Sequence, residues 1–151
     1  MATESKREMI LQNLKTVLAT IDGEDGYWTE VKSVKRVPFV PTEFQGEDKP
    51  GILIVATGEP EIIENQHSYH DKRDLKVGII GVLDRPENDE GTAINRFMKD
   101  IGIAIMLDPT RGGYANQTFK VSQSDESNLF GDLCLLVIEI NIRYHVDGRE
   151  E

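Results

Sequence analysis

Cysteine is almost missing from this sequence, with Cys134 alone among 151 residues. One cysteine forms no intramolecular disulfide and supplies no cysteine pair to a zinc site, so neither can hold this fold together. Cys134 stands among leucines, which predicts a place in the core. Long apolar runs are also missing, and the first ten residues lack the apolar segment of a signal peptide. We therefore expect no membrane partner and a reducing compartment.

Positive charge is scarce as well. Lys and Arg number 17 against 27 Asp and Glu, which leaves a net charge of -10 and disfavours binding to nucleic acid. The hydrophobic fraction of 38% is too high for a disordered chain, and the length fits one domain. We expect a single globular domain over residues 1–151.

Two helices are predicted from apolar spacing. Ser5 and Glu8 have the spacing of a capping box, and an apolar stripe from Ile10 to Ile21 follows, so a first helix is expected to end at Asp22-Gly23. Residues 93–105 repeat the pattern, and the Asp108 to Gly113 segment must end that second helix.

Strand patterns fill most of the remaining chain. They cover residues 28–37, 52–56, 61–65, 73–83, 117–121 and 133–144. Because helices and strands do not alternate regularly, the order favours an α+β domain with a mixed or antiparallel sheet and two helices packed on one face. The predicted core includes Leu14, Leu18, Phe97, Ile101, Ile138 and Ile140.

Candidate chemistry is sparse. The strongest cluster is His67, His70 and Asp71, which could approach one metal ion. A solvated hairpin tip is the favoured interpretation, because no second pair of ligands recurs elsewhere in the sequence. The carboxylates at 22–25 lack the ligand spacing of a calcium loop, and the glycines at 78–81 and 112–113 lack a phosphate-loop pattern. Ser122, Ser124 and Ser127 are expected in a polar connection with no nucleophile motif. We predict no catalytic, metal or cofactor site.

The segment from Pro38 to Pro50 predicts a long loop, because its three prolines cannot donate to a strand ladder. Connections in compact domains are usually about four to six residues long, so a loop of 13 residues is commonly functional or disordered. Phe39, Val40 and Phe44 either fold back on their own domain or contact another chain.

The whole chain resembles the tail terminator, or tail completion, proteins of tailed bacteriophages. The resemblance runs through the N-terminal helix, the Gly26 to Thr29 entry to the first strand, and the long loop before Ile52 to Val55. It continues through the Asp108 to Ala115 turn and the final strand that ends Asn141 to Tyr144. It rests on pattern rather than on one diagnostic motif.

This resemblance implies a non-enzymatic virion protein. It implies a homo-oligomeric ring, in this family a hexamer, that caps the tail tube at its head-proximal end, stops tube polymerisation and joins the head connector or neck proteins. The partners would be other copies of the chain, the tail tube protein and the connector, with assembly in the host bacterial cytoplasm and DNA only passing through the lumen. Interface candidates are Phe39, Val40, Phe44, Arg111, Tyr114 and Arg143.

Composition fits such a ring. Six copies at -10 each would carry -60 formal charges, and an acidic lumen would let DNA pass without sticking. Two alternatives stay open: another phage head–tail joining or tail assembly protein, and a small metal-dependent enzyme that uses the histidine cluster.

Overall fold

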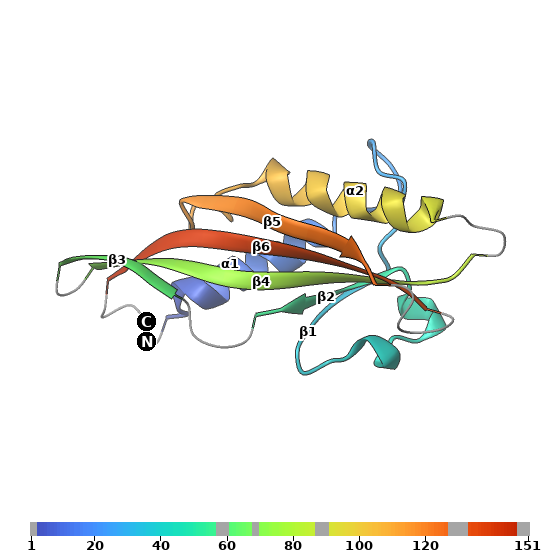
Figure 1. The fold of residues 1–151 in the computed structure, drawn as a ribbon, viewed down its shortest axis with the longest axis horizontal. Helices are drawn as coiled ribbons and strands as arrows, with labels where there is room; N and C mark the ends of the chain where they lie inside the picture. The colour runs from blue at the N-terminus through green and yellow to red at the C-terminus, as the bar shows by residue number, and fades with distance from the viewer. Residues whose placement is uncertain (1–2, 57–60, 68–69, 87–90, 127–132, 148–151) are drawn as a thin grey trace.

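Two helices cover one face of a six-stranded sheet (Figure 1). The computed structural model describes residues 3–56, 61–67, 70–86, 91–126 and 133–147, with the backbone alone at 61–67, 70–71 and 147. The α+β class predicted from the sequence is confirmed.

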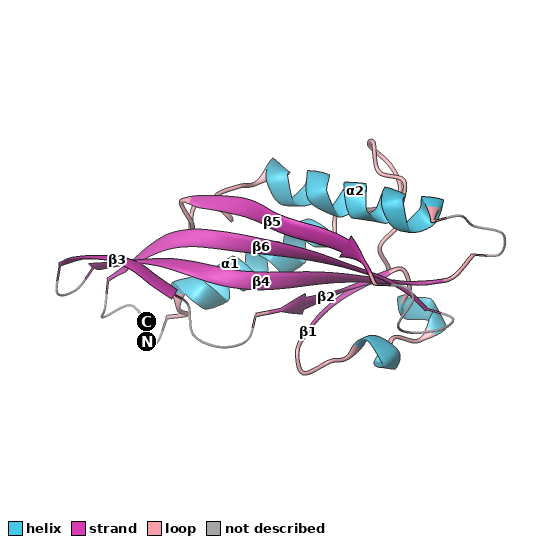
Figure 2. Cartoon of the chain, viewed as in Figure 1, coloured by secondary structure: helices cyan, strands magenta, loops and turns pink. Residues whose placement is uncertain are grey.

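The sheet is mixed, and its order is β1-β2-β4-β6-β5, with β3 also paired to β4 (Figure 2). Only β1 and β2 run parallel; the other pairs are antiparallel. In the described part of the chain, β1 and β5 end this path, and β3, which pairs with β4 alone, is a further edge. The bounds are β1 Ser33–Arg36, β2 Gly51–Val55, β3 Glu61–His67, β4 His70–Asp84, β5 Gln117–Asp125 and β6 Leu133–Asp147.

Helix α1 spans Lys6–Leu18 and begins as predicted, because the Ser5 hydroxyl accepts a hydrogen bond from the Glu8 amide at 3.1 Å. The Glu8 carboxylate does not return to the cap; it accepts hydrogen bonds from Arg36 at 2.8 and 3.0 Å and so ties α1 to β1. The helix ends at Leu18, earlier than expected, because the Thr20 and Ile21 amides donate to the Val17 and Leu18 carbonyl oxygens, three residues back instead of four.

Helix α2 spans Thr92–Leu107 and packs closely on the sheet. A Cβ atom at Gly81 would lie 2.9 Å from Phe97 and 2.8 Å from Leu136, so glycine at this position lets the helix approach β4. All six predicted core residues are buried between helices and sheet: Leu14, Leu18, Phe97, Ile101, Ile138 and Ile140.

The first strand is shorter than the predicted 28–37. The backbone amides of Trp28 and Thr29 donate to the carboxylate of Asp100, at 3.0 and 2.7 Å, instead of to a neighbouring strand. Asp100 lies on α2 and is fully buried. Its carboxylate therefore holds this segment against the helix and delays the strand until Ser33.

Strand β5 is longer than the predicted 117–121. It passes a bulge between Lys120 and Ser122 and pairs with β6 as far as Asp125, so Ser122 and Ser124 belong to the strand. The polar run looked like a connection because most of its side chains are exposed at the sheet edge. Ser127 lies outside the described residues.

A second, smaller core lies on the other face of the sheet. Its buried members are Phe44, Leu53, Val82 and Leu135. Phe44 comes from the predicted long loop, which contains two short 3-10 helices, Pro41–Glu43 and Gly46–Asp48. The loop is therefore ordered against the sheet.

Candidate functional site

The residues singled out for chemistry do not form a described site. The backbone of His67 pairs with that of His70 at the β3–β4 hairpin, while the side chains of His67, His70 and Asp71 lie outside the described part of the structure. The acidic segment at 22–25 is an exposed turn in which the Glu24 amide donates to Asp22 at 2.9 Å. Cys134 is buried in β6 as expected.

The long loop divides its three apolar interface candidates between core and surface. Phe44 is only 4% exposed, and its ring meets that of Phe39 edge to face at 5.0 Å between centroids. Phe39 is half-buried, whereas Val40 is 43% exposed. Of the two alternatives for these residues, folding back on the domain holds for Phe44, and Val40 is free to meet another chain.

Arg111 is fully buried inside the subunit, so its side chain is not at the surface. Its Nη2 atom donates to the backbone carbonyl oxygens of Ile105 and Asp108, at the end of α2. Burial lowers the pKa of the guanidinium, and the nearby Asp108 carboxylate opposes that change. From the sequence, an arginine in a proline- and glycine-rich turn is expected at the surface. Its burial could not be predicted, because it depends on how the end of α2 folds over the side chain.

The other two interface candidates remain accessible. Tyr114 is 40% exposed after the turn that ends α2. Arg143 lies on β6, donates to Asp74 at 2.9 and 3.2 Å, and places its guanidinium 5.2 Å from the centre of the Phe119 ring. The hydrogen bond to Asp74 raises the pKa of the Arg143 guanidinium above its ordinary value.

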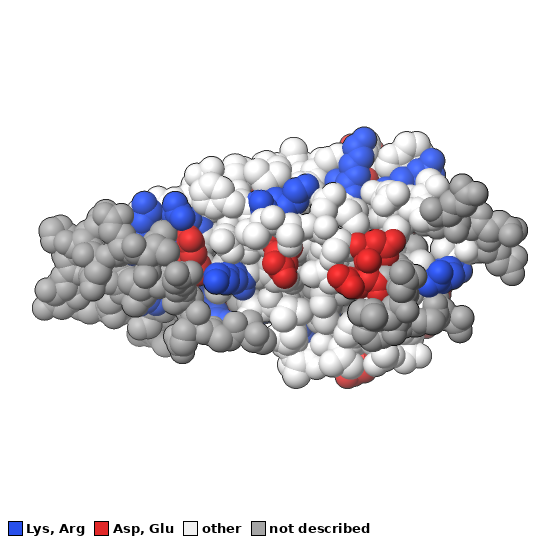
Figure 3. All heavy atoms as spheres, in the orientation of Figure 1, with Lys and Arg blue, Asp and Glu red and all other residues white. Residues whose placement is uncertain are grey.

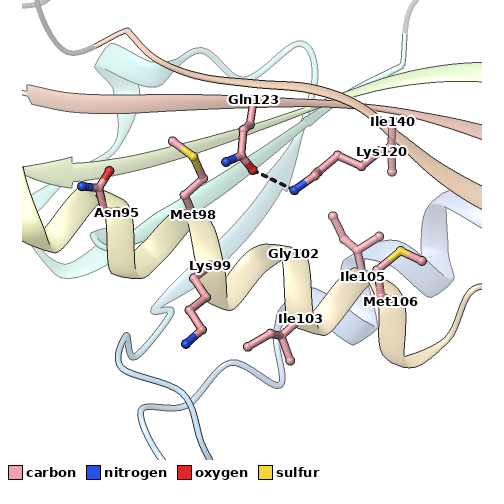
Figure 4. Close-up of a pocket in the computed structure, with 10 residues that line it drawn as sticks. All are labelled: Asn95, Met98, Lys99, Gly102, Ile103, Ile105, Met106, Lys120, Gln123 and Ile140. Atoms are coloured by element: carbon pink, nitrogen blue, oxygen red, sulfur yellow. Dashed lines mark hydrogen bonds between the residues drawn. The ribbon is translucent and has the colours of Figure 1, made fainter.

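A groove of about 610 Å³ runs between α2 and the edge strand β5 (Figure 4). Its apolar lining comes from Met98, Ile103, Ile105, Met106 and Ile140. Two lysines border it: Lys99 on α2, and Lys120 on β5, whose ammonium donates to Gln123 at 2.9 Å. In the described part of the chain, no acidic side chain lines this groove, although the sequence has ten more acidic than basic residues.

The outer surface of α2 beside this groove is apolar. Ile103, Met106 and Leu107 are 39%, 50% and 71% exposed. Gly102 lies between the lining residues, and a Cβ atom there would meet nothing within 4 Å. The sequence interpretation assigned the apolar residues of this helix to the core alone. The signal that it missed is that Ile103 and Met106 do not fall on the buried apolar face of the helix. They lie beside Gly102, a glycine inside the helix, and so indicate an apolar surface outside the core.

Two further surfaces stand out. A second groove, of about 530 Å³, crosses the sheet face that the helices do not cover, and it includes Val121, which is 56% exposed. Trp28 is 60% exposed and lies under the guanidinium of Arg96, 4.0 Å from the ring centre. The Asp100 carboxylate holds the backbone of Trp28, and its aromatic side chain lies at the surface.

Among the described residues, no helix has the length and apolar character needed to cross a membrane. No protein-family profile and no curated protein matches the chain. A solved structure described as the virion of a native gene transfer agent particle is similar to the chain, with a TM-score of 0.47 and 11% sequence identity over 93% of this chain and 95% of that one. At this TM-score, the similarity adds nothing to a functional assignment.

Proposed function

We propose that this protein is a phage tail terminator: a structural subunit that forms a hexameric ring at the head-proximal end of the tail tube. The observation that carries the proposal is the apolar groove beside the open edge strand β5, next to exposed Ile103, Met106 and Leu107. Monomeric proteins rarely expose contiguous apolar surface of this kind without a binding role.

The order of elements supports the same proposal. The family pattern expects an N-terminal helix, a long loop before the first buried strand, a helix that ends in the Asp108 to Gly113 turn, and a long final strand. Helix α1, the 38–50 loop, helix α2 and strand β6 stand in this order.

In this role the ring would stop the addition of tail tube subunits and offer its other side to the head connector. The net charge of -10 per copy suits a lumen through which DNA passes without binding. The candidates for these contacts are the accessible residues Val40, Tyr114 and Arg143. Trp28 and the exposed apolar residues of α2 are added to them: Ile103, Met106 and Leu107. The subunit performs no chemical step in this account.

The same surfaces would serve another head–tail joining or tail assembly protein, so the experiment must separate the two roles. Deleting the gene in its phage or prophage should give tail tubes longer than normal that lack heads, because nothing ends polymerisation. Tails of normal length that merely fail to join heads would instead favour a joining protein. Restoring the gene in trans is the control for both outcomes.

A further inference from the structure

We propose that the groove between α2 and β5 binds Val37 and the first part of the 38–50 loop, up to Glu47, of a second copy of this chain. This inference deepens the proposed ring and rests on it. It names the two surfaces that meet at every subunit contact.

The first argument is charge complementarity. Among the residues that the structure describes, the charged ones that line the groove are Lys99 and Lys120. The loop carries the exposed carboxylates Glu43 and Glu47. On the face shown in Figure 3, basic side chains gather along the edge that carries α2, whereas most acidic side chains lie over the middle of the face. Two copies of an acidic chain repel each other unless opposite charges are brought together in this way.

The second argument is apolar complementarity. Val37 and Val40 are 37% and 43% exposed at the start of the loop. They match the exposed Ile103 and Met106 beside the groove. Phe44 anchors the same loop in the second core and Phe39 packs against it, so the loop is held in shape before it docks.

The third argument is Gly102. Glycine inside a helix costs stability. Among the described residues, and apart from the nearby backbone of its own helix, nothing lies within 4 Å of the position that a Cβ at Gly102 would occupy. The subunit's own packing therefore does not require glycine at this position. A glycine here makes room for a neighbouring backbone to approach the helix closely.

The placement of the two surfaces makes the contact head to tail. The loop follows β1 and the groove borders β5, which are the opposite edges of the described sheet. A contact between two different surfaces of one chain repeats from copy to copy, and it closes into a ring when the rotation allows.

The test uses charge reversal in the full chain. The groove variant is Lys99→Glu with Lys120→Glu, and the loop variant is Glu43→Lys with Glu47→Lys. Each should weaken self-association by about 100-fold or more, because like charges then face each other at every contact. Native mass spectrometry at low ionic strength measures the oligomers, and circular dichroism checks that each variant folds.

Mixing the two variants gives the decisive result. The reversed groove of one then faces the reversed loop of the other, and the remaining contact is the native pair, so alternating rings should form from equal amounts of both. The chain that carries all four substitutions should also form rings by itself. Lys15→Glu, an exposed lysine on α1, is the matched control for Lys99→Glu and should leave assembly unchanged.

Several outcomes would overturn the inference. Rings that survive both reversals would show that another surface joins the subunits, while the ring itself and the proposed function would stand. Reversed-groove rings that no longer end tails would assign the groove to the tail tube or connector. A wild-type chain that stays monomeric at millimolar concentration would overturn docking between copies altogether.

Discussion

Substitutions of Gly102 are expected to affect the stability of the subunit and its assembly differently. In a helix interior, alanine is more favourable than glycine by about 0.5–1 kcal/mol. The added methyl group at this position meets open space in the subunit.

We therefore expect Gly102→Ala to raise the free energy of unfolding by about 0.5–1 kcal/mol in the monomer. Urea denaturation at dilute protein concentration measures this change. Gly102→Leu should keep the fold but block the groove, and so reduce ring formation in native mass spectrometry. A Gly102→Leu variant that assembles normally would show that no partner approaches the helix here.

Burial of Asp100 and Arg111 illustrates what residue-scale sequence reading misses. Both side chains are fully buried and hydrogen-bond to backbone groups. Asp100 accepts from amides of a segment distant in the sequence, and Arg111 donates to carbonyl oxygens at the end of α2. Apolar periodicity locates buried leucines and isoleucines, but it assigns a charged residue to the surface. Such contacts become visible only when the neighbouring element is in place.

At the scale of elements, the tie between α1 and β1 has a defined pH dependence. The hydrogen bond from Arg36 lowers the pKa of Glu8 below its ordinary value of 4.5, although partial burial opposes this. Because the pKa is lower in the folded state, the tie contributes its full stability above that ordinary value and loses it as the pH falls through the folded-state pKa.

Glu8→Gln should therefore lower the free energy of unfolding by about 0.5–1 kcal/mol at neutral pH, since the pair is partly exposed. The difference from wild type should vanish at strongly acid pH. Paired denaturation curves at the two pH values provide the measurement, with Glu4→Gln as the control at an exposed position. A difference that persists in acid would mean that Arg36 does not stabilise the charged form of Glu8.

The 38–50 loop makes a second element-scale prediction. Phe44→Ala should destabilise the subunit by about 3–5 kcal/mol. The substitution removes the phenyl group that packs with Leu53, Val82 and Leu135 in the small core. Val40→Ser should change stability by no more than about 0.5 kcal/mol, because Val40 is exposed.

Thermal unfolding and native mass spectrometry on both variants separate the two roles of the loop. The loop as an assembly element requires Val40→Ser to weaken rings without loss of fold. If Phe44→Ala leaves the melting temperature unchanged, the second core does not hold the loop.

Most elements were predictable because their apolar spacing reports one buried face. The β4 and β6 strands and both helices have such a face, and their buried positions agree with the spacing. The bounds of the edge strands were harder to predict. Strand β1 starts late because the amides of Trp28 and Thr29 donate to Asp100, and β5 extends through exposed serines. The groove could not be predicted, because it depends on how α2 lies against β5 and not on either segment alone.

At the scale of the whole molecule, the subunit has two edges of complementary charge. The sheet ends in β1 and its acidic loop on one side, and in β5 with the lysine-bordered groove on the other. The helices cover one face, and the opposite face is only partly covered by the core that contains Phe44. In the ring we propose, the open part of that face would border the lumen or the tail tube.

Such a subunit should form a closed ring and not an open filament if it ends a tube. Closure leaves no free groove and no free loop, so the assembly stops growing at a fixed copy number. The contacts between Lys99 or Lys120 and the loop carboxylates also make assembly sensitive to salt, because exposed charges are screened over about 8 Å at physiological ionic strength.

The most direct measurement is the native mass of the purified protein, paired with negative-stain images of the same sample. The account predicts one dominant species of six copies of the 17.0 kDa chain, seen as a ring with a central hole, which dissociates as salt is raised. A monomer at every concentration, or open filaments without a fixed copy number, would contradict it.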